Sequence, residues 1–429
     1  MITPVTVVWA YRRTGKFAFH VLTGALETAP ELADTPIVFA AGPGEVVAAA
    51  RAALTAGHRV LVGWSFYSPD FLRMATELAQ VQAALRDPRV RHIAGGVHAS
   101  AEPEATLQAG FDLAAVGEGE HLVRDLVRTL RAGGDPRTVT GIAARDDAGT
   151  PRRNGRGARA ELDAFPPVAP AHARYGPIEI TRGCVYACRF CQTPFFAGAT
   201  FRHRSVASVR HWARFLVGRG FRDFRFLTPT SLSYGARGTE PDLAAVEDLL
   251  AQVRAEIGPE RRLYFGTFPS ELRPEHVTPP ALALLRRFVD NRTLILGGQS
   301  GSDRVLTTTA RGHDVAAVER AVALCLEAGF QPHVDLLLGL PGETPDDVAL
   351  TLQLAEALAA RGARVHGHTF LPLPGTPLRH APPGQLAPAT RRRLLALASR
   401  GGLYGQWQEQ ETTAAGLAQA RNQARPDPA

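Results

Sequence analysis

Short apolar runs alternate with stretches of helical periodicity along the first third of the chain. Five runs bounded by turn-forming residues predict buried strands: Val5–Trp9, Ile37–Ala40, Arg59–Trp64, Val90–Ala94 and Leu113–Val116. Helices are predicted over Phe17–Glu27, Glu45–Ala56, Pro69–Arg86, Glu102–Ala109 and His121–Arg131. Such repeated strand–helix units are typical of a parallel sheet with both faces covered. Residues 1–133 are therefore predicted to form a Rossmann-like domain.

The same alternation returns after residue 177. Six further strands are predicted: Ile178–Thr181, Phe224–Leu227, Leu263–Phe265, Thr293–Leu296, His333–Leu338 and Arg364–Phe370. The helices between them are predicted over Val206–Arg219, Asp242–Ile257, Pro280–Val289, Val315–Ala328 and Pro345–Ala360. Six β/α units predict a partial barrel over residues 177–378, with reactive groups at the carboxyl ends of its strands, as in complete barrels.

Residues 134–176 lose this periodicity and are rich in Gly, Pro, Arg and Ala. We expect a linker here, with one hairpin formed by Thr140–Arg145 and the turn Asp146–Gly149. Residues 379–429 contain a helical pattern near Thr390–Ala398, followed by a tail that we expect to fray. The predicted fold class is α/β: a Rossmann-like domain, a partial (β/α)6 barrel and a short helical C-terminal extension.

The length of 429 residues is enough for two or three domains, each with its own core. No run of about 18 apolar residues occurs, as a membrane-spanning helix would require. The first residues, Met1–Trp9, lack the charged segment and the small-residue cleavage site of a signal peptide. We therefore expect a cytoplasmic protein that does not span a membrane.

The formal net charge of +7 raises the question of nucleic-acid binding. Nearly all cationic residues are arginines, Lys16 being the single lysine, and they are scattered along the chain. The run Pro151–Arg159 is typical of a solvated loop rather than of a surface with interleaved aromatic residues. The abundance of Arg, Ala, Gly and Pro is explained equally well by a GC-rich genome. A nucleic-acid substrate is therefore not favoured.

Three of the four cysteines lie close together in the sequence: Cys184, Cys188 and Cys191. Three thiolates can hold a cluster of four irons and four sulfurs and leave one iron open for a small molecule. A structural zinc site is the alternative, but it normally closes with four ligands in paired Cys-x2-Cys knuckles, and no second knuckle occurs. Cys325 lies in an apolar helical stretch, where we expect a buried, inert thiol. A disulfide is not favoured, because nothing marks secretion.

The Cys-x3-Cys-x2-Cys spacing, with Gly183 before the first cysteine and Phe190 before the third, resembles the cluster loop of the radical S-adenosylmethionine (SAM) enzymes. This resemblance implies a [4Fe–4S] cluster on the three cysteines and SAM on its open iron. It also implies reductive cleavage of SAM to a 5′-deoxyadenosyl radical, with electrons from a reductant such as flavodoxin or ferredoxin.

Glycine-rich turns follow three strands predicted in residues 1–133, at the edge where open α/β sheets bind ligands. The turns Gly95–Ser100 and Gly117–Glu120, with the runs before them, closely resemble the cobalamin-binding domain of the B12-dependent radical SAM enzymes. The resemblance implies base-off cobalamin with its tail near these turns. The cobalamin contacts are then Ser65, Gly95, Gly96, His98, Gly117, Glu118, Gly119 and Glu120.

The Asp-x-His-x-x-Gly motif, whose histidine ligates cobalt in methionine-synthase-type domains, does not occur in this region. The resemblance to the radical SAM subgroup implies that no protein histidine is needed on the metal. His98 is then a turn residue packing against the cobalamin tail or its own backbone, and ligation of cobalt by His98 is the alternative. A Rossmann-like domain that no longer binds cobalamin is a further alternative.

The predicted barrel strands end in sequences similar to SAM-binding stretches of the superfamily. Thr228–Ser231 matches the Gly-Gly-Glu-type motif in position more than in letters, and Gly297–Ser302 is similar to Gly-x-Glu-Ser-Gly-Ser with Gln299 in place of glutamate. Gly339–Thr344 matches the recurrent Gly-Leu-Pro-Gly-Glu-Thr. By this resemblance the SAM contacts are Phe190, Thr228, Thr230, Gln299, Ser300, Leu338 and Gly339. Glu271 or Arg273 could meet the SAM carboxylate or substrate.

His366 and His368 alternate on a predicted strand, so both side chains point to the same face. If that face is the barrel interior, one of them can act as a substrate acid or base. Histidines packed against helices are the alternative.

The whole resemblance implies a cobalamin-dependent radical SAM methyltransferase acting on an unactivated centre of a small-molecule or peptide substrate. Cyclisation or rearrangement with the same cofactors, and a non-catalytic cobalamin or redox sensor, are the alternatives. Methylthiolation of tRNA or protein is not favoured. Those enzymes carry a second cluster in their N-terminal region, whereas Cys184 is the first cysteine of this chain.

Overall fold

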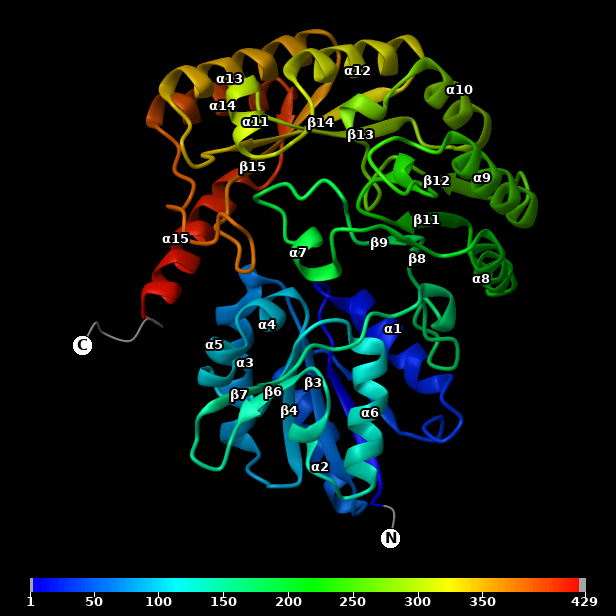
Figure 1. The fold of residues 1–429 in the computed structure, drawn as a ribbon, viewed down its shortest axis with the longest axis vertical. Coiled ribbons are helices and arrows are strands. Elements are labelled where there is room, and N and C mark those ends of the chain that lie inside the picture. The colour runs from blue at the N-terminus through cyan, green and yellow to red at the C-terminus, as the bar shows by residue number, and fades with distance from the viewer. Residues whose placement is uncertain (1–2, 424–429) are drawn as a thin grey trace. The chain divides into compact units, whose positions relative to one another are not determined.

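The computed structural model describes residues 3–423 and divides the chain into two compact units, Met1–Gly176 and Pro177–Ala429. Figure 1 shows both units as mixed α/β structures. The predicted fold class is therefore confirmed.

The first unit is built on a seven-stranded sheet in the order β2-β1-β3-β4-β5-β6-β7. Its strands are β1 Val5–Ala10, β2 Ile37–Ala40, β3 Arg59–Ser65, β4 Val90–Gly95, β5 Leu113–Ala115, β6 Ile142–Arg145 and β7 Pro151–Asn154. The first five run parallel. Their order 2-1-3-4-5 reverses direction between β1 and β3, which is where doubly wound sheets bind ligands.

Helices cover both faces of this sheet, because alternate residues of its strands are apolar on both sides. Val7 and Trp9 of β1 belong to the core beneath α1 Lys16–Glu27 and α6 Gly119–Arg131. Val8 and Ala10 belong to the core on the other face, beneath α2 Pro43–Thr55 and α3 Phe71–Ala84. Glu120, in the first turn of α6, is buried.

The helix predicted over Glu102–Ala109 forms, and a further short helix that was not predicted precedes it. The structure has α4 Val97–Ala101 followed by α5 Pro103–Gln108. Pro103 is the first residue of α5, where its fixed φ and missing N–H are tolerated but a continuous helix from α4 is not.

The predicted hairpin forms, but it is an edge of the sheet rather than part of a free connector. β6 pairs antiparallel with β5, and β7 pairs antiparallel with β6. Ala143 of β6 packs with Leu107 and Ala114. This apolar contact explains why the hairpin folds onto the first unit.

The second unit has two parallel sheets that continue one another. One contains β8 Ile178–Glu179, β11 Asp223–Leu227 and β12 Arg262–Tyr264; the other contains β13 Thr293–Gln299, β14 Gln331–Leu338, β15 Arg364–Thr369 and β16 Leu403–Tyr404. A bridge between Leu272 and Leu296 connects them. Two short strands, β9 Thr181–Arg182 and β10 Arg202–His203, form a separate antiparallel pair.

Helices lie along the outer side of this curved sheet (Figure 1): α8 Val206–Gly218, α9 Leu243–Ile257, α10 Pro279–Phe288, α12 Val315–Glu327 and α13 Pro345–Ala360. Outward side chains of β14 and β15, such as Val334 and Val365, are fully buried, whereas the inward His333, His366 and His368 are half-buried. The inner face of the partial barrel is therefore the accessible one.

The C-terminal segment contains α14 Pro388–Ser399, as expected, and also β16, whose two residues are too few to give a sequence pattern. The tail predicted to fray forms α15 Trp407–Gln423, because Trp407 is buried and packs near Gly367 of β15. Residues 424–429 of that predicted tail lie outside the described residues. Within 3–423, no helix has both the length and the apolar character needed to cross a membrane.

Candidate active site

The three clustered cysteines occupy the loop between β9 and α7 Thr193–Ala197. Gly183 begins this loop with φ +85°, and a Cβ there would lie 2.1 Å from the carbonyl oxygen of Thr200, so only glycine fits. Burial is the main cause that raises the pKa of Cys184 to about 11, and the nearby Cys191 and Cys188 act in the same direction. The three thiols therefore converge on one volume, as ligands of a single metal cluster must.

Two buried arginines face the cysteine loop. Arg311 is 9% exposed, and its Nη1 lies 3.5 Å from Sγ of Cys188 while its Nη2 donates to the carbonyl oxygen of Gly297 at 2.7 Å. Arg273 donates to the backbone carbonyl of Arg311 and lies 3.5 Å above the ring centroid of Tyr186. Cations in these positions stabilise thiolates. The sequence analysis did not single out Arg311, although it follows the Gly297–Ser302 stretch closely.

The polar residues predicted to bind SAM have different surroundings. Thr228 donates to the carbonyl oxygen of Thr230 at 3.1 Å, while Oγ1 of Thr230 is buried without a partner among the described residues. Gln299 ends β13 at an irregularity in the strand pairing, with φ +70°. Ser300 is fully buried and shares a hydrogen bond of 3.2 Å with Thr351. Ser300 therefore holds the turn, whereas Thr230 and Gln299 keep polar groups available.

The apolar residues predicted to bind SAM connect the cysteine loop to the strand ends. Phe190 packs against a buried cluster of Val305, Leu340 and Phe370. Leu338 is buried at the end of β14. A Cβ on the following Gly339 would lie 2.9 Å from Cα of Gly384, so the backbone passes closely there. This packing fixes the position of the loop relative to the ends of β13, β14 and β15.

A cluster of polar side chains lies on the inner face of β14, β15 and β16. Asp335, His366 and Tyr404 stand in register on the three strands. Oδ1 of Asp335 is 2.9 Å from Nδ1 of His366, which is 3.1 Å from Nε2 of His368. The rings of His366 and Tyr404 stack with centroids 4.5 Å apart. The two histidines thus share the inner face, together with an aspartate that the sequence analysis did not single out.

Glu271, on the loop after β12, belongs to the same inner surface. Burial and the negative charge of Asp335 raise its pKa to about 7, while His368 and Arg311 act in the opposite direction. Arg311 also contacts Cys188, so its charge acts both on the cysteine loop and on Glu271.

The predicted cofactor turns of the first unit meet at the carboxyl ends of β1, β3 and β4. Ser65 ends β3, and a Cβ on Gly96 would lie 2.9 Å from the carbonyl oxygen of Phe66. A Cβ on Gly95 would meet nothing closer than 3.8 Å. The sequence analysis missed Gly15 after β1, whose φ is +78° and whose Cβ would lie 2.7 Å from the carbonyl oxygen of Ser65. These glycines bring the turns after β1, β3 and β4 backbone to backbone at the reversal point of the sheet, with the Cβ position of Gly95 left open; we call this group of turns the cradle.

His98 points into the first unit rather than out of it. It is 4% exposed, its ring stacks on Phe71 with centroids 4.2 Å apart, and Phe66 flanks it. Neither ring nitrogen has a partner among the described residues, and burial lowers its pKa to about 4. A ring enclosed in this way supports the wall of the cradle and offers no nitrogen to a metal outside.

The Gly117–Glu120 turn is covered by the chain itself. Gly117, with φ +103°, forms a bridge with Gly157, whose N–H donates to the carbonyl oxygen of Val116 at 2.8 Å. Glu118 is buried and accepts from the N–H of Ala160 at 2.8 Å. Gly119 begins α6. This turn therefore anchors the segment after the β6–β7 hairpin to the sheet.

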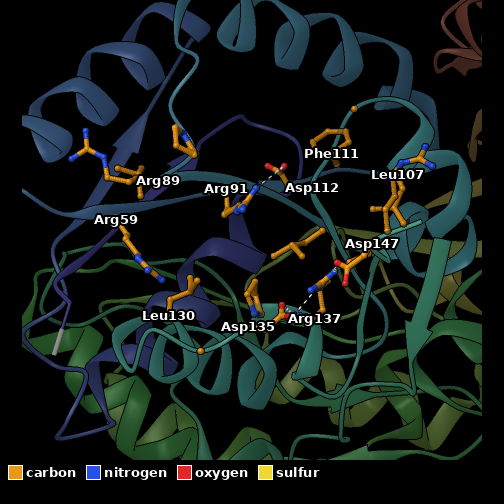
Figure 2. A pocket seen from close by; sticks show the side chains of 18 residues that line it. Arg59, Arg89, Arg91, Leu107, Phe111, Asp112, Leu130, Asp135, Arg137 and Asp147 are labelled. Carbon is orange, nitrogen blue, oxygen red and sulfur yellow. Dashed lines mark hydrogen bonds and ion pairs between the residues drawn. The ribbon is translucent and has the colours of Figure 1, made fainter. Parts of the chain in front are cut away.

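Figure 2 shows a pocket of about 890 Å³ at the opposite edge of the first unit. It is lined by residues such as Arg59 and Leu113, which are the first residues of β3 and β5. Arg137 is paired there with Asp135 and Asp147 at 2.7 and 2.6 Å. Because ligands of open α/β sheets bind at the carboxyl ends of the strands, this pocket is not the predicted cofactor site.

Residues 178–355 match the model of the radical SAM superfamily. The chain is 28% identical over 294 residues to the tRNA-2-methylthio-N(6)-dimethylallyladenosine synthase of Pelobacter propionicus, covering 66% of this chain and 60% of that protein. It is 30% identical over 301 residues to the ribosomal protein uS12 methylthiotransferase RimO of Frankia casuarinae, covering 62% and 50%. The chain thus spans little more than half the length of these relatives.

Solved structures share the fold over most of the chain. The radical SAM methyltransferase TsrM of Kitasatospora setae, with cobalamin and a [4Fe–4S] cluster bound, has a TM-score of 0.65 at 18% identity and covers 89% of this chain and 75% of its own. The cobalamin-dependent radical enzyme OxsB has a TM-score of 0.66 at 15% identity and covers 93% and 56%. At these identities the likeness establishes the architecture.

Proposed function

We propose a cobalamin-dependent radical SAM methyltransferase acting on an unactivated centre of a small-molecule or peptide substrate, and the match of residues 178–355 to the radical SAM superfamily supports this proposal. The observation that carries the proposal is the convergence of three thiols beside two buried arginines on the inner face of a partial barrel. TsrM, which shares the fold, has been solved with tryptophan and a SAM analogue, which supports a small-molecule substrate.

The donor set fits a [4Fe–4S] cluster. Cys184, Cys188 and Cys191 supply three thiolates, and no fourth cysteine lies in residues 3–183 or beside the loop in the described chain, Cys325 being buried on α12. One iron is thus left for SAM. Thr230 and Gln299 are our candidates for its polar groups, and Phe190 for packing beside it.

The first unit fits base-off cobalamin. Within the cradle, Gly95 leaves its backbone open to a ligand at the reversal point of the sheet, and His98 is enclosed and unsuited to cobalt. When bound, these groups supply reductive cleavage of SAM to a 5′-deoxyadenosyl radical and delivery of a methyl group. Residues of the chain bind and orient the reactants, and the inner-face pair His366 and His368, held by Asp335, is our candidate for contacting the substrate.

Methylthiolation is the second candidate, because the curated relatives are methylthiotransferases. It requires thiolates for a second cluster, and residues 3–183 contain no cysteine. Methyl transfer is therefore favoured. An electron donor such as flavodoxin or ferredoxin completes the proposed system.

The test is anaerobic reconstitution with iron, sulfide and hydroxocobalamin, followed by desalting, a visible spectrum, and an assay of 5′-deoxyadenosine after addition of dithionite and SAM. We expect one cobalamin per chain and deoxyadenosine formation that is abolished in Cys184→Ala but retained in the matched Cys325→Ala. Deoxyadenosine without retained cobalamin would refute methyl transfer from cobalamin. Absence of a cluster would favour the alternative interpretation, in which the three cysteines bind zinc.

A further inference from the structure

Three ligand atoms converge on the inner face of the second unit at a place that the cysteine cluster does not use. Oδ1 of Asp335, Nδ1 of His366 and Nε2 of His368 are separated by 2.9, 3.1 and 3.8 Å. The two strands that carry them are adjacent, and their pairing sets Asp335 beside His366. All three atoms lie within 4.8 Å of one another.

Protons alone leave one of the two short contacts of His366 without a linear hydrogen bond. Nδ1 of His366 has a single in-plane position, which holds either a proton or a lone pair. If it holds a lone pair, it faces the carboxylate oxygen of Asp335 at 2.9 Å without a proton between them. If it holds a proton, that proton is directed at Asp335, and the 3.1 Å contact with Nε2 of His368 has no proton along it, whether Nε2 carries a lone pair or a proton directed at Asp335. Nδ1 of His368 lies 3.2 Å from the amide nitrogen of Gln410 and can accept from it when the proton of His368 is on Nε2.

We propose that Asp335, His366 and His368 bind a divalent transition-metal ion such as zinc or iron(II). A tetrahedral ion with bonds of about 2.0–2.1 Å separates its ligand atoms by about 3.3 Å, and the three observed separations scatter around that value. Two histidines and one carboxylate leave at least one position open, as in catalytic zinc sites and non-haem iron sites.

The surroundings favour a cation. Glu271 is a second carboxyl group near Asp335 and His368, and its side chain makes no ion pair among the described residues. The ring of His366 is held by its stacking on Tyr404, whose hydroxyl is 2.9 Å from Nδ1 of His333. Outer contacts of this kind orient the rings of metal-bound histidines.

Gln410 provides a specific consequence. Its Oε1 accepts from the N–H of Thr369 at 2.9 Å, and its Nε2 faces Nδ1 of His368. A metal on Nε2 of His368 requires a proton on Nδ1, so the amide must turn to present an acceptor. A carboxylate at position 410 satisfies both Thr369 and His368. Gln410→Glu therefore tightens metal binding, by about tenfold if it acts like other outer-shell carboxylates.

The open position of the ion points to a role as an anchor for a substrate carboxylate, hydroxyl or amine. This role rests on the proposed function, because it presumes that the substrate lies on the inner face of the barrel. Metal binding itself does not depend on it.

The test uses the full chain with its cluster reconstituted, dialysed against Zn²⁺ and then against metal-free buffer. We expect about one zinc per chain by elemental analysis, and a zinc absorption edge whose first shell contains only nitrogen and oxygen at about 2.0 Å. His368→Ala and Asp335→Asn abolish this zinc without changing iron content or circular dichroism. His211→Ala, at an exposed position of α8 in the same unit, retains it.

Sulfur in the first shell would place the zinc on the cysteines and overturn the proposal. So would zinc retention unchanged in His368→Ala, or no retained zinc in the wild type; the latter would leave the histidines as a proton-exchanging pair. Deoxyadenosine formation is measured on the same samples. Zinc binding without SAM cleavage would refute the proposed function and leave the metal site standing, and the reverse result would refute only the metal site.

Discussion

Asp347 is the residue whose removal we expect to loosen the Gln299 turn most selectively. It is buried at the third position of α13, where its Oδ2 accepts from the N–H and hydroxyl of Thr344 at 2.8 and 2.7 Å. Its Oδ1 accepts from the hydroxyl of Ser302 at 2.5 Å, and Arg304 pairs with it. One carboxylate therefore caps α13 and holds the turn after Gln299.

The magnitude follows from these contacts. Loss of the capping box costs about 1 kcal/mol. Loss of the hydrogen bond from Ser302 to this charged carboxylate, which leaves a buried hydroxyl without its acceptor, costs a further 1.5–3 kcal/mol or so. Solvent screens the pair with Arg304, because that guanidinium is half-exposed, and we count its contribution within this range. We expect Asp347→Ala to lower the free energy of unfolding by about 3 kcal/mol.

The matched control is Asp346→Ala. Asp346 is exposed in the same first turn of α13 and carries the same charge, so its removal changes only the interaction with the helix dipole, about 0.3–1 kcal/mol. Because a chain of two units need not unfold in one step, the measurement is native-state hydrogen exchange of the α13 amides. Equal losses of protection in the two variants would refute the reasoning.

The effect of Asp347 also has a defined pH dependence. The hydrogen bond from Arg304 is the largest of the contacts that hold the pKa of Asp347 below its usual range. A carboxyl group whose folded pKa is depressed stabilises the fold above its unfolded pKa, and this contribution is lost as the pH falls through the folded value. The difference between wild type and Asp347→Ala should therefore be full at pH 7 and shrink below about pH 4.

Three further results are expected. Gly96→Ala should lower cobalamin retention without changing iron content, because the added Cβ meets the backbone of Phe66. Gly57→Ala, at a similar positive φ but with open space around the Cβ, should retain cobalamin, as visible spectra after desalting will show. Cys188→Ala should lose the cluster absorbance that Cys325→Ala keeps. Burial lowers the pKa of His98 in the folded chain to about 4, so below pH 6.5 the unfolded chain binds a proton that the folded chain does not. The free energy of unfolding should therefore fall by up to about 3 kcal/mol as the pH drops from 6.5 towards 4. Urea unfolding of His98→Phe should show a smaller fall over that range, and an identical pH profile would contradict this.

The elements of both units were predictable because each is long enough to show its periodicity. Strands such as β1 and β3 are largely apolar runs, and α12 and α13 follow the 3.6-residue spacing. The parts that were not predicted are short or depend on distant contacts. β16 has two residues, and the β6–β7 hairpin was expected in a linker because its pairing with β5 leaves no local signal.

Motif similarity located the candidate site but did not assign a role to each side chain. Ser300 belongs to a recognisable stretch, yet its hydroxyl is turned to Thr351 inside the unit. His98 lies in a cofactor-like turn, yet Phe66 and Phe71 enclose it. The conformation of a turn decides whether each of its side chains faces a ligand or the core. A motif match includes residues of both kinds and does not distinguish them.

The Asp335–His366–His368 group is a cluster that motif similarity did not locate at all. Asp335 stands within an apolar run, where a carboxylate reads as an interruption, and the two histidines lie some thirty positions later on another strand. Parallel pairing brings them together only in the observed register: a shift of one residue between β14 and β15 would place Val334 or Leu336 beside His366, on opposite faces. A buried carboxylate on the inner face costs free energy unless a proton donor or a cation compensates it. The register that buries Asp335 beside two imidazoles is therefore itself an argument that something positively charged belongs among them.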